Sequence, residues 1–206
     1  MGDTPSARGD RPAVTSRLTL MPMTPSTAFD QAVARVRTLQ VRPELDLVEA
    51  PAPRRMAPDA LALTIDANDG DVDLGSGRFV ILHNPAGEAA WEGTMRLVLY
   101  VDAVVESDLA GDPLLPEVGW SWLQESLADA GMPYWALGGT VTRVQSESYG
   151  AMAERGLEGR LQVRASWTGA QVSDLPAHVT AWTSLMATAC GLEPVPEGVA
   201  VLRPRG

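Results

Sequence analysis

The chain has 206 residues, a formal net charge of −10 and 16 basic residues, all of which are arginine. The lack of lysine excludes Schiff-base chemistry and a phosphate-loop lysine, and the acidic charge disfavours general binding to nucleic acid or anionic membrane, because counterion release needs clustered positive charge. A single cysteine excludes an intrachain disulfide.

The two ends of the chain differ in composition from its middle. Residues 1–25 are rich in Ser, Thr, Pro, Arg and Gly, which predicts a disordered tail, and residues 193–206 are expected to form a second tail. The intervening residues 26–192 are long enough to bury a core and predict a single domain. The apolar patch 18–23 is interrupted by polar and proline residues, and no other run approaches the ~20 apolar residues of a membrane span. We therefore expect a cytoplasmic protein.

One helix and two short strands are expected in the first part of this domain. Apolar residues recur at helical spacing within residues 26–40. They are Phe29, Val33, Val36 and Leu39. Residues 45–48 and 61–65 each predict a short strand, and the proline-rich stretch 50–58 predicts a linker between them.

An acidic segment, residues 66–73, resembles a calcium-binding loop. Placing Gly70 at the sixth position of such a loop puts Ile65 and Ala67 where oxygen ligands are required. This mismatch favours a solvated acidic loop, and no metal site is predicted here.

A β-hairpin is predicted next. Residues 78–83 form a β-branched and aromatic run, residues 84–87 (Asn-Pro-Ala-Gly) have the composition of a turn, and residues 94–106 form the second strand. Every second residue of this strand is apolar, so that side should face the core. These residues are Met95, Leu97, Leu99, Val101, Ala103 and Val105. The other side of the strand is too apolar to be fully exposed to solvent and is expected to be partly covered. It carries Arg96, Val98, Tyr100, Asp102 and Val104.

A helix, two strands and a final helix complete the prediction. Pro116 suits the first turn of a helix that ends at Gly131; its apolar stripe is Val118, Trp120, Leu123 and Leu127. Residues 137–145 predict a strand with a bulge at its two glycines, and residues 160–167 alternate between polar and apolar. Residues 173–176 (Ser-Asp-Leu-Pro) predict a capped helix start. The apolar residues of this last helix are Val179, Trp182, Leu185, Met186 and Ala189.

This order of elements predicts an α+β fold. We expect a single domain with a twisted antiparallel sheet of about five to six strands. The helices should pack mainly on one face, in the order helix, strands, helix, two strands, helix.

Reactive side chains are few and scattered. Neither histidine has a second histidine or a cysteine at metal spacing, so no metal or cofactor is predicted, and His83, at a predicted strand end, is the better functional candidate of the two. Cys190 is interpreted as a half-buried small residue, since nothing near it in the sequence would lower its pKa. Four carboxylates would form an acid–base pair only if the fold brought them together. They are Glu88, Glu92, Asp112 and Glu117.

The six tryptophans divide into two groups. Trp120, Trp167 and Trp182 fall on predicted core stripes and are interpreted as structural. The remaining three are less obviously internal and are candidates for an aromatic binding groove, although core packing is the competing interpretation. They are Trp91, Trp122 and Trp135.

Four segments resemble those of a known family. In chain order they read GRFVILHNPAGEAAWEGTMRLVLYV, DPLLPEVGWSWL, ALGGTVT and RASWT. They are similar to the actinobacterial family catalogued as domain of unknown function 3000, over about residues 27–193. Because that family has no established activity, the resemblance implies none. The order of elements is also similar to that of type III secretion chaperones and related small chaperone-like families, whose twisted antiparallel sheet carries helices on one face and often dimerises.

These observations favour a non-enzymatic binding or chaperone-like protein that acts through a semi-apolar sheet face. Its partner would be another protein or a second copy of the chain, and neither nucleic acid nor a membrane. No catalytic residue is assigned. The candidate binding residues are Trp91, Val98, Tyr100, Val104 and Arg164. The alternative is a small-molecule-binding or catalytic domain with a pocket near Trp91, Tyr100 and Arg164. A deep pocket with convergent polar groups would favour this alternative, and a broad shallow apolar patch would favour a partner.

Overall fold

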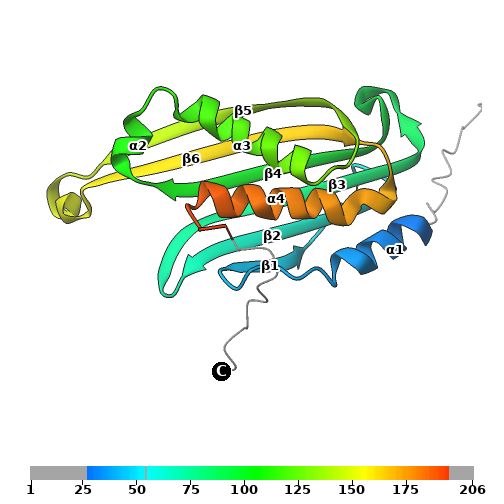
Figure 1. The fold of residues 1–206 in the computed structure, drawn as a ribbon, viewed down its shortest axis with the longest axis horizontal. Helices are drawn as coiled ribbons and strands as arrows, with labels where there is room; N and C mark the ends of the chain where they lie inside the picture. The colour runs from blue at the N-terminus through cyan, green and yellow to red at the C-terminus, as the bar shows by residue number, and fades with distance from the viewer. Residues whose placement is uncertain (1–26, 54, 195–206) are drawn as a thin grey trace, which may run out of the picture.

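A computed structural model describes residues 27–53 and 55–194 of the chain (Figure 1). The predicted tail 1–25, and the predicted tail 193–206 from residue 195 onward, lie outside the described residues. In chain order the helices and strands are α1 Thr27–Val36, β1 Leu45–Ala50, β2 Asp59–Asp69, β3 Val72–Glu88, β4 Gly93–Val105, α2 Ser107–Gly111, α3 Leu115–Asp129, β5 Tyr134–Glu147, β6 Leu157–Gly169 and α4 Leu175–Ala189. Short 3₁₀ turns are η1 Ala89–Trp91, η2 Gly150–Arg155 and η3 Val172–Asp174.

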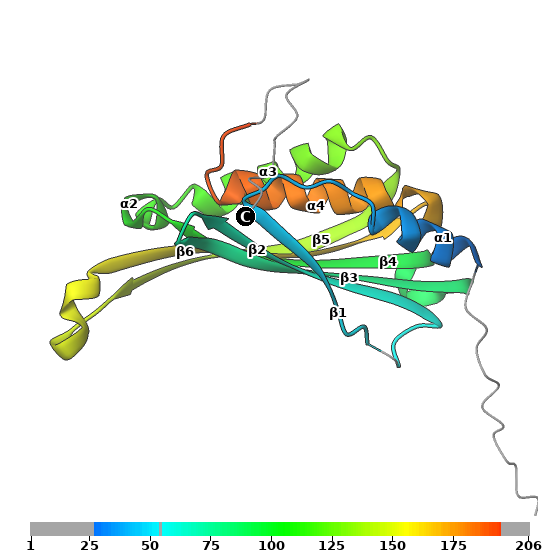
Figure 2. The same ribbon diagram turned by 90° about the horizontal axis from the view of Figure 1, so that it is seen from below.

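The strands form one six-stranded antiparallel sheet in the order β1-β2-β3-β4-β6-β5. The described helices all lie on one face of this sheet, and none of them lies on the opposite face (Figures 1 and 2). The predicted α+β fold is therefore confirmed, in its strand number as well as in its one-sided helical layer.

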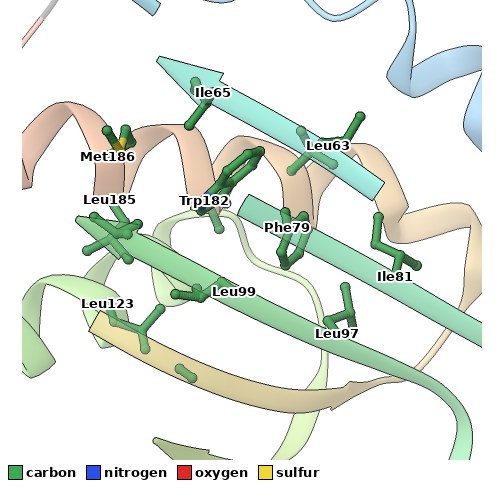
Figure 3. Close-up of a cluster of buried hydrophobic side chains, with 14 of the residues drawn as sticks. Leu63, Ile65, Phe79, Ile81, Leu97, Leu99, Leu123, Trp182, Leu185 and Met186 are labelled. Atoms are coloured by element: carbon green, nitrogen blue, oxygen red, sulfur yellow. The ribbon is translucent and has the colours of Figure 1, made fainter. Parts of the chain in front are cut away.

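The core lies between the sheet and α4. The predicted inward side of β4 is confirmed, because its residues from Met95 to Ala103 are buried and only Val105 is partly exposed. In Figure 3, Leu97 and Leu99 of β4 share this core with Trp182, Leu185 and Met186 of α4. The Phe79 and Trp182 rings stack, with their centroids 5.3 Å apart. Such pairs add to the free energy gained by burying the apolar surface.

The predicted acidic loop 66–73 is wrong. Strand β2 continues to Asp69 and β3 begins at Val72, so that only Gly70 and Asp71 form the turn. Gly70 has φ +59°, which two-residue hairpin turns require and glycine adopts without strain. Ile65 and Ala67 are fully buried, and their alternation with outward acidic residues keeps this segment extended.

The predicted turn at residues 84–87 is also wrong. Strand β3 continues to Glu88, and the chain reverses at η1. The Asn84 side chain accepts a hydrogen bond from the Ala86 N–H and donates one to the Gly87 carbonyl, both 3.1 Å long. These local bonds accommodate an irregularity in the β3–β4 register between His83 and Glu88. Residues with turn chemistry thus bend a strand here without ending it.

The helix predictions hold with three changes. Helix α3 has Pro116 in its first turn and is followed by Gly131 at φ +70°, but Val118 is exposed and Leu115 and Gly119 are on the buried side instead. Helix α4 has the predicted buried stripe, whereas Asp174 at its N-cap makes no side-chain capping bond. Helix α1 ends at Val36 instead of residue 40, with Leu39 partly buried beyond it.

Candidate functional site

The face of the sheet on which no described helix lies is the lower face in Figure 2. It presents the outer side of β4, where apolar and polar residues are mixed. Val98 and Val104 are exposed there, while Arg96, Tyr100 and Asp102 are half-buried. We call this surface the open face. Apolar and charged side chains meet on this face outside the core.

Part of the open face is covered by the chain itself. The connection between β1 and β2 passes on this side of the sheet (Figure 2). Arg78 donates a hydrogen bond from Nη2 to the Pro51 carbonyl of this connection (3.3 Å). Ala62 and Leu82 belong to the outward side of β2 and β3 by alternation, yet both are buried. The uncovered area is therefore centred on β4, β6 and β5.

This uncovered area contains a groove of about 370 Å³. Two rows of residues cross four neighbouring strands to form it, because the register of the sheet places them opposite one another. The first row is Arg78, Tyr100, Arg164 and Thr140. The second row is Val80, Val98, Ser166 and Gly138. A Cβ atom at Gly138 would meet no atom within 4 Å, so the groove is open at the β5 edge.

Tyr100 and Asp102 are the centre of a polar network beside this groove. The Tyr100 hydroxyl donates to Asp102 Oδ2 (2.9 Å), and Asp102 also accepts from Arg160 Nε (2.7 Å) and Gln162 Nε2 (3.2 Å). Partial burial, followed by the Asp102 contact, raises the pKa of Tyr100. The phenol is therefore neutral at physiological pH and does not act as a base.

Two arginines that line the groove, Arg78 and Arg164, have a positive charge that no described carboxylate neutralises. The Arg164 guanidinium lies 5.0 Å from the centre of the Tyr100 ring, a cation–π contact. Neither Arg164 nor Arg78 forms an ion pair with a described carboxylate, and both are exposed. Tyr100 lies between them in the same row, and the apolar Val80 and Val98 lie in the neighbouring row. The groove thus offers an apolar floor with positive charge along one side.

The structure brings together three of the five residues predicted for binding. Val98, Tyr100 and Arg164 line the groove, and Val104 lies farther along the same face of β4. Trp91 does not line it, since it belongs to η1, where its carbonyl accepts a hydrogen bond from Thr168. Sequence reasoning missed Arg78, Val80, Thr140 and Ser166. These residues belong to strands that were predicted from the sequence, but only the register of the sheet shows that their side chains meet in one groove.

His83 is an interior residue in the middle of β3. Its Nδ1 lies 2.8 Å from Asp59 Oδ2, and its ring stacks on Phe29 of α1 with centroids 5.5 Å apart. All three side chains are buried on the helical side of the sheet. This arrangement joins α1 to the β2–β3 pair, which is a structural role, and it lies on the other side of the sheet from the groove.

The remaining candidates do not form a site. Glu88 and Glu92 flank η1, whereas Asp112 and Glu117 follow the other end of β4, a strand of 13 residues. At ~3.4 Å per residue the two pairs are about 40 Å apart, too far for joint acid–base chemistry. Among the described residues, no ring contact joins Trp91, Trp122 and Trp135, so these three side chains do not form one aromatic cluster.

Cys190 is a buried thiol. Its Sγ–H donates to the Leu74 carbonyl (3.4 Å), and burial raises its pKa to about 11. We expect iodoacetamide at pH 8 to alkylate the native protein about 100-fold more slowly than the urea-unfolded chain, because the thiolate fraction falls by this factor. Equal rates in the two states, measured by mass spectrometry, would show that the thiol is accessible.

Among residues 27–53 and 55–194, no three side chains of His, Cys, Asp or Glu are arranged to hold a metal ion. None of the described helices is long and apolar enough to span a bilayer.

A family model described as "Protein of unknown function (DUF3000)" matches residues 25–200 of the chain. No curated protein and no solved structure matches the chain.

Proposed function

The chain belongs to the DUF3000 family, and we propose that it is a non-enzymatic binding protein that holds an acidic, apolar segment of a partner protein in the groove of its open face. This use of a sheet face resembles that of chaperone-like proteins, which cover apolar segments of their partners. The observation that carries the proposal is the pairing of an apolar floor with two unpaired arginines.

The chemistry of the groove specifies the segment. Val80 and Val98 lose water contact when an apolar side chain covers them, which stabilises the complex by about 25 cal/mol per Å² of apolar surface. The guanidinium groups of Arg78 and Arg164 are suited to bidentate hydrogen bonds with carboxylates. A segment in which Leu or Val alternates with Glu or Asp supplies both contacts, and an extended backbone keeps its side chains at strand spacing.

Binding is favoured over catalysis by the residue types present. The lining contains no histidine, cysteine or carboxylate, so it lacks the usual general bases and nucleophiles. Tyr100 has a raised pKa, which makes it a hydrogen-bond donor instead of a base. A groove lined by these residues can select its ligands by their shape and charge, but it has no group that would catalyse a reaction on them.

A synthetic 12-residue peptide with alternating Leu and Glu tests this proposal by fluorescence anisotropy. We expect Arg164→Glu and Tyr100→Glu to weaken its binding at least tenfold, because each places a negative charge against the peptide carboxylates. Arg35→Glu is the matched control, since Arg35 is exposed on α1 and carries the same charge; its affinity should stay within about twofold of wild type. Thermal melts should show that all three variants are folded.

Two outcomes contradict the proposal. The first is a peptide affinity that does not respond to either substitution on the open face. The second is equal binding of a peptide with Gln in place of Glu, which would remove the role of the arginines.

A small apolar carboxylic acid is the second candidate ligand. The groove volume of about 370 Å³ falls within the ~300–1,000 Å³ of small-molecule sites. Isothermal titration with decanoate and with the peptide separates the two candidates. Tight binding of decanoate together with no binding of the peptide would favour the small-molecule function.

A further inference from the structure

Strands β5 and β6 continue beyond the rest of the sheet as a two-stranded arm closed by η2 (Figures 1 and 2). We define the arm as residues 146–158, within which Ser146 pairs with Glu158 and Glu147 with Leu157. Figure 2 shows that the arm bends toward the side of the open face. It therefore projects from the molecule in the direction that the groove faces.

The arm exposes large apolar side chains together with acidic ones. Tyr149 is 72% exposed, Met152 50% and Leu157 43%. The arm contains Glu147, Glu154 and Glu158 against a single arginine, Arg155. Apolar side chains exposed at this level mark an interaction surface when they cluster on a projecting element. The arm has the same combination of apolar and acidic groups that the groove is suited to hold.

An arm does not reach the groove of its own chain. The arm and the β5–β6 side of the groove belong to the same two strands, and Arg164 of the groove is separated along β6 from Leu157 of the arm by seven residues, or about 24 Å at ~3.4 Å per residue. The strand pairing between them is continuous from Thr140 to Glu147. Bringing the arm back onto its own groove would break that pairing. A second molecule has no such restriction.

We propose that the occupant of the open face is a second copy of this chain, and that each arm lies in the groove of the other copy. A two-fold axis that runs parallel to the sheet and perpendicular to its strands, outside the open face and opposite Arg160 midway between arm and groove, places each arm over the partner copy's groove. Each acidic arm then meets Arg78 and Arg164. Such an interface is reciprocal and closed, so it ends at a dimer instead of growing into a fibre.

This dimer rests on the proposed function, because it uses the same groove for an acidic, apolar segment. It also adds regulation to that function. A partner segment and the arm compete for one groove, so binding of a partner would open the dimer. The apparent affinity for a partner would then fall as the concentration of the chain rises.

Disulfide trapping in the full chain tests the contact directly. One preparation carries Met152→Cys in the arm, and a second carries Thr140→Cys in the groove. The native Cys190 is buried and forms a slow-reacting background. We expect oxidation of the mixture to give a crosslinked dimer, and oxidation of either preparation alone to give little, because identical positions are far apart across the proposed axis. A mixture that crosslinks no more than the single preparations do overturns the arrangement.

Sedimentation velocity of the wild type and of an arm-shortened chain gives the second readout. Residues 148–156 are replaced by Asn-Gly, a two-residue turn suited to join the paired residues Glu147 and Leu157. We expect a concentration-dependent dimer for the wild type and a monomer for the shortened chain. A Tyr149→Ser/Met152→Ser variant, which keeps the backbone, should weaken the dimer at least tenfold and replaces the shortened chain if that chain fails to fold.

The outcomes separate this inference from the proposed function. A wild type that remains monomeric at about 100 µM, which means a dimer Kd above roughly that concentration, overturns the arm–groove contact. A dimer that the arm variants leave unaffected also overturns it. The Leu–Glu peptide is then titrated into the arm-shortened chain, whose groove has no arm to compete. If the arm-shortened chain binds the peptide but the wild type forms no dimer, the arm–groove contact is wrong and the proposed function is retained. If the arm-shortened chain does not bind the peptide, the proposed function is wrong, whether or not the wild type forms a dimer.

Discussion

Replacing Leu99 by alanine is expected to lower the free energy of unfolding by about 2–5 kcal/mol. Leu99 lies on the inward side of β4 in the middle of the sheet and is only 2% exposed. Its side chain packs in the layer between the sheet and α4, which Figure 3 shows. Truncation removes three buried carbons and leaves a cavity that strands held by pairing on both sides cannot close.

Urea melts followed by circular dichroism measure this loss, with Val98→Ala as the matched control. Val98 is the adjacent residue on the same strand but is 39% exposed on the open face. Its truncation should cost less than about 1 kcal/mol, the span of strand propensities. A loss below about 0.5 kcal/mol for Leu99→Ala would be typical of a surface substitution and would contradict the assignment of this side of β4 to the core.

Acid is expected to destabilise the protein through His178. This residue is fully buried in α4, and its Nδ1 accepts a hydrogen bond from Trp167 Nε1 (3.2 Å). Burial lowers its pKa from 6.5 to about 4. Its Nε2 has no hydrogen-bond partner among the described residues. Protonation would place a charge in the core that Asp174 compensates only in part, and it would remove the acceptor of the Trp167 bond.

The sign of the effect follows from the two pKa values. Above pH 6.5 the imidazole is neutral in both the folded and unfolded states, and the contribution to stability is complete. Between pH 6.5 and 4 the unfolded chain takes up a proton that the folded chain does not, so stability is lost as the pH falls. From pH 7.5 to 4.5 the expected loss is about 2.5 kcal/mol, since each pKa unit corresponds to ~1.36 kcal/mol.

The His178→Gln variant isolates this contribution. Glutamine keeps a hydrogen-bond acceptor for Trp167 and cannot be protonated in this range, while the two proteins share every other ionisable group. Urea melts from pH 7.5 to 4.5 should therefore show a steeper loss for the wild type than for the variant. Parallel curves would mean that His178 titrates alike in the folded and unfolded states.

The alternation of apolar residues was sufficient to predict the sheet and its buried side. In β4 and β6 every second residue is apolar, and burial follows this pattern because adjacent side chains point to opposite faces. The local signals of turns were less reliable. Residues 84–87 have turn chemistry but continue β3, because strand pairing over a long stretch outweighs the preference of four residues.

The sequence by itself therefore determined the class of the fold, the inward side of β4 and β6 and the mixed character of the outer side of β4. Only the tertiary structure decided which of those outer residues meet. Arg78, Tyr100, Arg164 and Thr140 come from four strands distributed along the chain, and they form one row only because the register of β3, β4, β6 and β5 aligns them. Register depends on pairing between segments far apart in the chain, and a slip of one residue would turn each side chain to the other face. The pattern of residues within one segment does not show which other segment it pairs with. For this reason Trp91 was predicted at the groove and Arg78 was not.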